Sequence, residues 1–385
     1  MAEPLKIAVI GGGIGGLSSA VALAGIGHSV TVYEQAADIS PMGSCLSLWP
    51  NAMQCLADWG LAAGLQENGA VLSRLSARRL DGRPYFSADL SEIYEEFSAN
   101  GICVRRSDLQ SALLQALDAD QIRFGRRLVD LKQDGQTVEL TFENGTRETA
   151  DLVIGADGLR SKTRDIVLKD GPPRYAGYGA WLGIADAFPS TIKQDEICEY
   201  YGSHGRFGVA PTGAGHAYWF YVENNPEPRQ AAGPIETVGL MDALRQWPEF
   251  ARDLVRNTPE DAVIYAPFFD RPATRNWGKG RVLLLGDAVH PFTPNLGQGA
   301  CQSIEDAHVL AELLRRNTAP EDLLSAYQKA RAKRANMFAK QSRQIGMVTQ
   351  MTSPGLRWLR GLLLMSARDR QWQRSLRQHF TRPAI

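Results

Sequence analysis

The sequence lacks an excess of charge, a cysteine framework and a long apolar run, and each absence removes a class of protein. Its 385 residues include 42 Lys and Arg and 42 Asp and Glu, so no overall positive field recruits nucleic acid. The five cysteines show no CxxC or metal-ligand spacing. No apolar segment is long enough for a membrane span, and no signal-peptide pattern precedes the first apolar run. We therefore expect a cytoplasmic protein with no bound metal, no nucleic-acid partner and no stable membrane insertion.

A glycine turn near the start of the chain points to a dinucleotide. Residues 6–10 form an apolar run typical of a strand buried in a parallel sheet, residues 15–27 have the small and apolar pattern of a helix packed on it, and residues 29–34 read as a second strand. Glycines in the turn between strand and helix let the backbone approach a diphosphate, and the helix N-terminus offers free N–H donors. The glycines of this turn that we assign to the cofactor are Gly11, Gly13, Gly15 and Gly16.

An acidic residue closes the second strand. Glu34 follows Gly16 by 18 residues, where a carboxylate accepts hydrogen bonds from ribose hydroxyls. The same carboxylate would repel a 2′-phosphate. The strand, turn, helix, strand and Glu together predict a bound dinucleotide with an unphosphorylated adenosine ribose.

Two further motifs follow expected strands. Residues 155–164 match the pattern DGxxSxxR, and residues 286–291 read Gly-Asp-Ala-Val-His-Pro, followed by a turn at residues 294–299. Asp287, at a strand end, is placed to bind a ribitol or ribose hydroxyl. The turn opens a helix whose N–H groups could stabilise negative charge on a flavin ring.

The middle and the end of the chain have different textures. Residues 175–267 are rich in aromatics and alternate like an antiparallel sheet, which suggests a substrate layer. Residues after Gln302 are helical, and the basic segment 356–376 is expected to be one terminal helix packed on the cofactor domain. A membrane-surface, partner or dimer contact of this segment is the alternative.

The three motifs, in this order and spacing, resemble those of the single-component FAD-dependent aromatic hydroxylases, the p-hydroxybenzoate-hydroxylase-like monooxygenases, over residues 7–335. The resemblance implies an α/β fold: a Rossmann-like FAD-binding domain of the GR2 type, an inserted and mainly antiparallel substrate domain, and C-terminal helices. The implied FAD domain comprises residues 1–73, 97–172 and 268–330, the substrate domain residues 74–96 and 173–267, and the helical segment residues 331–385.

The resemblance also implies a tightly bound FAD, with NADH or NADPH as a transient reductant and O2 as the co-substrate. By it, Glu34 binds the adenosine ribose, Arg106 contacts the ribityl-phosphate region, Asp157 lies near the pyrophosphate and Asp287 holds the ribityl chain. For Arg106, a surface charge or an ion pair with Asp108 is the alternative. The remaining residues assigned to the cofactor site are Gln35, Ser47, Val129, Gly158, Gly286, Gly297, Gln298 and Gly299, and Pro294 would face the flavin ring where oxygen reacts.

Within this family the chain is most similar to the bacterial FAD-dependent urate hydroxylases. Their substrate-site arginine and tyrosine are matched by Arg206 and Tyr218, which lie 12 residues apart. A guanidinium can donate paired hydrogen bonds to a carbonyl-rich anion, and a tyrosine can orient the ring or relay a proton. A surface position for Arg206 and a core-packing role for Tyr218 are the alternatives.

Several other residues carry less specific signals. The segment 43–46 replaces a small Gly-Ala run that is familiar beside the flavin, and Val289 stands where a smaller residue is commoner; both departures affect the pocket. His290, in a strand-to-helix corner, is expected to be a packed structural histidine rather than a base. Cys45 and Cys301 are assigned no catalytic role.

The implied reaction is hydroxylation of a small anionic aromatic or heteroaromatic ring through a flavin C4a-hydroperoxide, with conversion of urate to 5-hydroxyisourate favoured. The alternatives are a hydroxylase of a phenolic or pyridine acid such as salicylate or 3-hydroxybenzoate, a halogenase, and an FAD-binding regulatory protein. Expected partners are a small aromatic or purine-like substrate and, at most, a second copy of the chain, so that the protein is a monomer or a homodimer.

Overall fold

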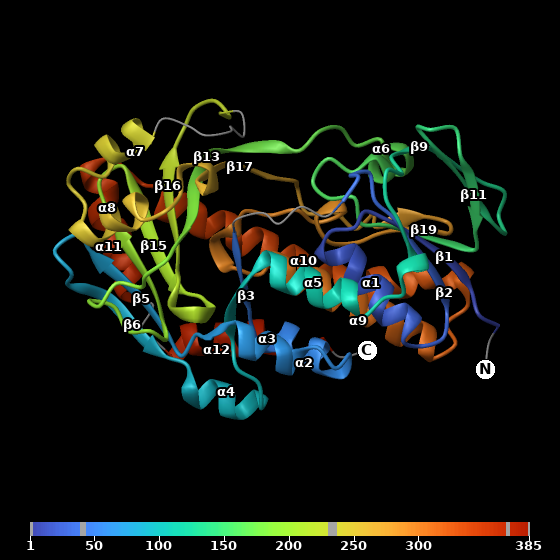
Figure 1. The fold of residues 1–385 in the computed structure, drawn as a ribbon, viewed down its shortest axis with the longest axis horizontal. Coiled ribbons are helices and arrows are strands. Elements are labelled where there is room, and N and C mark those ends of the chain that lie inside the picture. The colour runs from blue at the N-terminus through green and yellow to red at the C-terminus, as the bar shows by residue number, and fades with distance from the viewer. Residues whose placement is uncertain (1–2, 39–43, 230–236, 367–369, 384–385) are drawn as a thin grey trace.

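The computed structural model describes residues 3–38, 44–229, 237–366 and 370–383. Two large sheets lie at opposite ends of an elongated molecule, and helices run between them (Figure 1). The helices are α1 (Ile14–Ala24), α2 (Pro50–Asp58), α3 (Ala62–Asn68), α4 (Ser91–Phe97), α5 (Arg106–Gln115), α6 (Lys162–Leu168), α7 (Thr237–Ala243), α8 (Glu249–Arg256), α9 (Gly299–Arg315), α10 (Pro320–Thr349), α11 (Pro354–Ser366) and α12 (Arg370–Phe380).

The cofactor-side sheet is mainly parallel. Its strands, in spatial order, are β18 (Gly278–Lys279), β19 (Val282–Leu284), β12 (Leu152–Gly155), β1 (Lys6–Ile10), β2 (Ser29–Tyr33) and β8 (Ile122–Arg123). Only β18 runs antiparallel to its neighbour. The strands that the three motifs follow, β1, β12 and β19, are therefore adjacent, so their carboxyl ends meet at one edge of the sheet.

The apolar run of β1 is buried on both faces of this sheet. Ile7 and Val9 belong to the main core with α1 and α9, whereas Ala8 and Ile10 face a second core. A small antiparallel sheet completes the second core, with strands β11 (Arg147–Ala150), β10 (Val138–Phe142) and β9 (Leu128–Gln133). A strand with apolar residues at every position suits this double burial.

The second large sheet is antiparallel apart from one pair. Its strands, in spatial order, are β17 (Ile264–Asp270), β13 (Arg174–Ala185), β16 (Ala217–Asn224), β15 (Gly205–Pro211), β14 (Glu196–Tyr201), β5 (Arg74–Arg79) and β6 (Pro84–Asp89). The β5–β6 hairpin comes from early in the chain and joins the sheet through a parallel pairing of β5 with β14. One face packs Phe207, Trp219 and Trp181 against α7 and α8, and the other face lines a cavity. We call this second sheet the substrate sheet, after the role that the sequence leads us to expect for it. A third set of short strands, β3 (Cys45–Leu48), β7 (Ile102–Arg105) and β4 (Ala70–Val71), connects the two halves.

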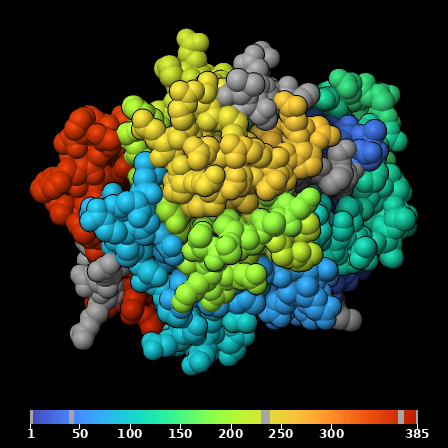
Figure 2. Space-filling model, turned by 60° about the vertical axis from the view of Figure 1, so that its left-hand side comes forward, coloured from blue at the N-terminus to red at the C-terminus, as the bar shows by residue number. Residues whose placement is uncertain are grey.

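The expectation of an α/β fold with a mainly antiparallel second sheet is confirmed, but the expectation for the C-terminus needs correction. Two helices, α11 and α12, stand where one was expected. Helix α11 contacts β6 of the substrate sheet, while α12 contacts α2, so the segment packs on both halves of the molecule. Figure 2 shows the C-terminal residues at one flank of the molecule, beside the blue β5–β6 hairpin. Arg360 of α11 donates a hydrogen bond to the carbonyl oxygen of Gly202, the residue that follows β14. This contact holds α11 against the substrate sheet.

The cysteines and the helix lengths can also be described in the structure. All five cysteines are buried free thiols. Among the described helices, none combines the length and the apolar content that a membrane span requires.

Candidate active site

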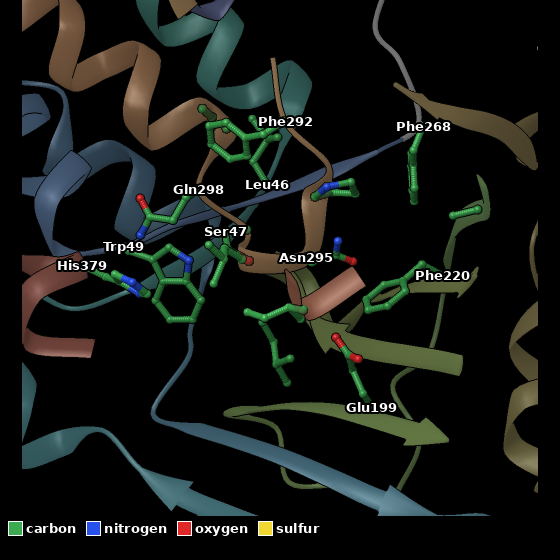
Figure 3. Close-up of a pocket in the computed structure, with 18 of the residues that line it drawn as sticks. Leu46, Ser47, Trp49, Glu199, Phe220, Phe268, Phe292, Asn295, Gln298 and His379 are labelled. Atoms are coloured by element: carbon green, nitrogen blue, oxygen red, sulfur yellow. The ribbon is translucent and has the colours of Figure 1, made fainter. Parts of the chain in front are cut away.

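A cavity of about 790 Å³ lies between the carboxyl edge of the cofactor-side sheet and one face of the substrate sheet. One wall, the cofactor wall, comes from the turns after β1, β12 and β19. The opposite wall, the substrate wall, comes from the substrate sheet and from α10, α11 and α12. Figure 3 shows Ser47, Trp49 and Gln298 on one side of the space and Phe220 and Phe268 on the other.

The glycine turn after β1 has two kinds of glycine. Gly11 has φ +107°, and a Cβ on Gly16 would lie 1.9 Å from the Gly11 carbonyl oxygen, so the turn itself requires both. Gly13, the N-cap of α1, lines the cavity, and a Cβ there would meet no atom within 4 Å. Helix α1 has no side-chain cap and no acidic residue in its first turn. The turn therefore presents an open cradle of N–H groups that fits the diphosphate of a dinucleotide.

Glu34 lies beside this turn. Its carboxylate accepts hydrogen bonds from the backbone N–H groups of Gly12 (2.6 Å) and Ala36 (2.8 Å). The Arg126 N–H donates to the Glu34 carbonyl at 2.8 Å, which places the start of the β9 region next to Glu34. The other two predicted residues of this end differ in position: Gln35 is exposed, and Val129, on β9, is 38% exposed and lies outside the cavity lining.

Asp157 organises its own loop. Its carboxylate accepts hydrogen bonds from Ser161 and from the backbone N–H of Thr163 (2.9 Å), and burial raises its pKa. Ser161 in turn caps α6, accepting from the Arg164 N–H at 2.9 Å. Two residues of the 155–164 segment line the cavity, Ala156 and Gly158, the latter with φ +78°.

The arginine of the same motif joins two of the turns. Arg164 is buried and donates to the carbonyl oxygens of Ala288 (3.0 Å) and Val289 (2.7 Å). The DGxxSxxR pattern thus ties the loop after β12 to the loop after β19. Sequence reasoning had identified the motif but not this connection, because no spacing rule links Arg164 to residues more than a hundred positions away.

Asp287 and Arg106 share the cavity. Asp287 is the second residue of the short 3-10 turn η4 (Gly286–Ala288) that follows β19, and it lines the cavity. Because protein surrounds the cavity, burial raises the pKa of Asp287, an effect that His290 and Arg106 oppose. Arg106, at the start of α5, is half-buried and lines the same space.

We call the turn at residues 294–299 the oxygen-site turn, after the role expected for it from the sequence. Buried side chains fix its conformation. Gly297 has φ +59°, and Gly299 opens α9 with open space where a Cβ would stand. Gln298 is buried, and its side-chain oxygen accepts hydrogen bonds from Asn51 (3.0 Å) and Gln302 (3.2 Å). The turn therefore presents its backbone to the cavity in one orientation, with the positive end of the α9 dipole behind it.

A fully buried charge cluster underlies this turn, and sequence reasoning missed it. Arg331 of α10 donates to Glu305 and, at 2.7 Å, to Asp306, which are successive residues of α9. His290 lies 2.6 Å from Asp306, so it is a packed structural residue. Burial would raise the pKa of Asp306, but His290 and Arg331 lower it below its ordinary value. These charges come from α9, α10 and the turn that contains His290, and sequence spacing alone cannot show which of them pair.

Arg206 and Tyr218 both line the cavity from the substrate sheet. They point from the same face of the adjacent strands β15 and β16, but Arg206 pairs with Val222 and Tyr218 with Ala210. Four residues therefore separate the two positions along the sheet, roughly 13 Å of backbone. Arg206 is only 3% exposed, which excludes a surface role, and burial raises the pKa of Tyr218.

The partners of Arg206 were not foreseen. Its guanidinium donates to the side-chain oxygen of Asn295, in the oxygen-site turn, and lies 3.5 Å from Glu199 of β14. Glu199 also accepts a hydrogen bond from the Tyr201 hydroxyl at 2.7 Å. Figure 3 shows Glu199 on the substrate-sheet side of the cavity and Asn295 near its centre. Arg206 thus connects the substrate sheet to the oxygen-site turn.

Most of the other residues of the substrate wall are apolar, although Ser76, Tyr201, Gln344, Thr349 and His379 also line it. The apolar residues come from the strands of the substrate sheet and from the last helices. They include Leu75, Ala77, Phe86, Leu182, Ile197, Phe220, Val222, Leu363, Leu364, Trp372, Leu376 and Phe380. Of the two departures noted in the sequence, Cys45 and Leu46 line the cavity, Val289 is buried beneath it, and Gly43 lies outside the described residues. Among the described residues, no group of three or more His, Cys, Asp or Glu side chains is placed to hold a metal ion.

The fold and the cavity are those of a flavoprotein hydroxylase, and comparison with known proteins establishes the class. The chain belongs to the FAD binding domain family, whose pattern matches residues 4–342. It is an FAD-dependent monooxygenase, in a family whose members use NAD(P)H and O2.

Two curated relatives and one solved structure illustrate the range of the family. The chain is 34% identical over 371 residues to the aurachin C monooxygenase/isomerase of Stigmatella aurantiaca, covering 96% of each. It is 32% identical over 370 residues to the FAD-dependent urate hydroxylase of Mycolicibacterium vanbaalenii, covering 92% of this chain and 91% of that one. A crystal structure of Klebsiella pneumoniae HpxO complexed with FAD and uric acid has a TM-score of 0.90 at 28% identity, covering 97% of this chain and 96% of that one.

Proposed function

We propose that this enzyme hydroxylates a planar, nitrogen-containing aromatic ring that Arg206 holds against the oxygen-site turn, and that urate is the first substrate to test. The single observation that carries the proposal is the position of Arg206, which lines the cavity and contacts Asn295 of that turn. The similarity of the chain to a FAD-dependent urate hydroxylase and to HpxO complexed with uric acid supports the choice of urate.

We assign the cofactor wall to FAD. The cradle of Gly11, Gly13, Gly15 and Gly16 would hold its diphosphate and Glu34 its adenosine ribose. The other residues assigned to FAD are Gln35, Ser47, Arg106, Val129, Asp157, Gly158, Gly286, Asp287, Gly297, Gln298 and Gly299, and Pro294 is assigned with Arg206 and Tyr218 to the catalytic residues. When bound, FAD supplies the transfer of electrons from NAD(P)H to O2.

The polar residues of the substrate wall suit a lactam edge, where a ring N–H adjoins a carbonyl. The Arg206 guanidinium can donate to the carbonyl, and the neighbouring Glu199 carboxylate can accept from the N–H. Urate has several such edges. Because the pKa of Tyr218 is raised, its hydroxyl stays protonated near neutral pH and acts as a hydrogen-bond donor that orients the ring. The apolar side chains around these groups exclude water from the reacting atoms.

A second candidate substrate is a larger nitrogen heterocycle with an apolar substituent, such as an alkylated quinolone. The apolar wall favours it, because Leu75, Phe86, Leu363 and Trp372 offer a small purine no polar partner. The similarity to an aurachin C monooxygenase/isomerase supports testing this class.

The test is substrate-stimulated NADH and NADPH oxidation, with the oxygenated product identified by mass spectrometry. The panel contains urate, xanthine, salicylate, 3-hydroxybenzoate, a hydroxypyridine and an alkylquinolone. We expect urate to accelerate NAD(P)H oxidation and to be consumed. If only the alkylquinolone is oxygenated, the urate assignment is wrong and the second candidate holds. If the phenolic acids are the ones oxygenated, both ring assignments fail.

A substitution separates substrate recognition from cofactor binding. Arg206→Gln should raise the KM for the substrate or uncouple NAD(P)H oxidation, with FAD still bound. Arg256→Gln, an exposed arginine on α8 that lies away from the cavity, is the matched control and should change neither. Loss of FAD from Arg206→Gln would mean that this residue belongs to the cofactor site instead.

A further inference from the structure

Helix α11 turns its hydrophobic side chains toward solvent and a charged side chain toward the protein. Five of its large hydrophobic side chains that do not line the cavity are exposed to solvent, and Trp358 is 70% exposed. We call these five the outward face; they are Leu356, Trp358, Leu359, Leu362 and Met365. At 3.6 residues per turn they fall within about half of the helix circumference. A helix on the surface of a globular protein ordinarily turns such a stripe toward the core.

Contacts on the opposite face of α11 prevent the helix from rotating about its axis to bury the hydrophobic side chains. Arg360 is buried and donates to the carbonyl oxygens of Met351 (3.1 Å) and Gly202 (2.9 Å), and its guanidinium lies 5.3 Å from the centre of the Tyr201 ring. A Cβ on Gly361 would come within 3.1 Å of the Tyr85 ring, so the backbone approaches β6 closely there. These contacts hold the arginine inward and the hydrophobic stripe outward.

The charge of the C-terminal segment indicates what covers this face. Residues 354–385 contain seven arginines, no lysine and one acidic residue, and the rest of the chain carries the balancing excess of acid. Arg360 is buried, and Arg377 and Arg382 pair with Glu96 and Asp58, but the segment as a whole keeps an excess of positive charge. A symmetric contact with a second copy would place this positive segment against itself. An anionic bilayer attracts it instead. The most exposed residue of the face is a tryptophan, the side chain favoured at the boundary between headgroups and acyl chains.

The length of the helix limits how it can meet a bilayer. With 13 residues, α11 is about 20 Å long, too short to cross the hydrocarbon core. It can lie in the plane of the interface with its apolar stripe inserted, as amphipathic surface helices do.

We propose that the outward face of α11 docks this enzyme on the surface of an anionic lipid bilayer. The proposal does not rest on the identity of the substrate. It has a consequence for the site, however, because Leu363 and Leu364 of the same helix line the cavity. Docking therefore brings one wall of the cavity to the membrane surface, where a lipophilic ring would be dissolved.

The test is cosedimentation of the FAD-loaded full chain with vesicles of phosphatidylcholine alone or mixed with phosphatidylglycerol. We expect binding to the mixed vesicles that weakens with salt and with omission of the anionic lipid. The double variant W358S/L362S should bind about tenfold or more weakly, because it removes two inserting side chains. Phe124→Ser, at a site 39% exposed near β8, is the matched control and should bind like the wild type.

Three results would overturn the proposal. One is binding by the double variant that equals that of the wild type. The second is the absence of binding to either vesicle. The third is a dimer, seen by analytical ultracentrifugation, that the double variant abolishes while neither protein binds lipid, since a second copy would then cover the face. Because both substituted side chains point outward, FAD content and Tm should be unchanged in the double variant, which separates lost docking from misfolding.

Discussion

The two walls of the cavity are built in different ways. The cofactor wall consists largely of backbone, presented by glycine turns at the ends of adjacent parallel strands. The substrate wall consists of side chains, contributed by the strands of the substrate sheet and by helices from the last part of the chain. If FAD binds as proposed, a wall of backbone groups would recognise what every FAD has in common, whereas the specificity of a wall of side chains can change by single substitutions. The following changes test that division, in order of decreasing expected effect.

The buried charge cluster beneath the oxygen-site turn should be the most sensitive point. Arg331→Met leaves Glu305 and Asp306 with less compensation and should lower the free energy of unfolding by about 4 kcal/mol, measured by urea denaturation. Lys329→Met, on the same helix, is the control and should have little effect.

The same cluster predicts a pH dependence. The folded-state pKa values of Glu305 and Asp306 are below their ordinary values, so their stabilising contribution is present above the unfolded pKa of about 4 and is lost as the pH falls below it. The loss should be shallower in Arg331→Met, because burial without the arginine raises those pKa values. An equal slope in both proteins would contradict the pairing.

Two alanine substitutions in the glycine turn should fail for different reasons. Gly16→Ala places a Cβ against the Gly11 carbonyl and should cost about 3 kcal/mol of folding stability. Gly13→Ala meets open space, so the protein should keep its Tm but bind FAD more weakly, because the methyl group occupies the diphosphate cradle. Thermal unfolding and flavin titration distinguish the two. A lower Tm for Gly13→Ala without FAD would show that this glycine is structural.

On the substrate wall, Glu199→Gln should act on catalysis alone. The amide that replaces the carboxylate is a weaker acceptor, so kcat/KM for a substrate with a ring N–H should fall by about 2 kcal/mol, roughly 30-fold, with FAD content unchanged. A substrate analogue with that nitrogen methylated should show a much smaller ratio between wild type and variant. Equal ratios would remove Glu199 from substrate recognition.

The smallest effect is expected at the edge of the cofactor wall. Val129→Ala removes exposed apolar surface near the adenosine end and should weaken FAD binding by about 1 kcal/mol without changing Tm. FAD affinity equal to that of the wild type would show that Val129 is not a cofactor contact.

Several features could be read from the sequence because they depend on residues close together in the chain. The strand before Gly11, the turn and α1 follow from spacing within twenty residues, and Glu34 follows from the length of one strand–helix–strand unit. The GDAVHP run placed Asp287 at a strand end in the same way. Such local patterns are constrained by backbone geometry, and so they define the dinucleotide and the sheet that presents it.

Other features depended on contacts between distant segments. The sequence by itself determined the FAD-binding family, because glycine turns and strand periodicity leave few alternatives. Only the tertiary structure decided that Arg206 contacts Asn295 and Glu199, that Arg331 neutralises α9 from α10, and that Arg360 turns α11 inside out. In each case several polar groups were possible partners for a charged side chain, and only the fold determines which of them it contacts. Hydrophobic periodicity identifies which residues are apolar, but the partners of buried charges determine which face of an element is turned inward.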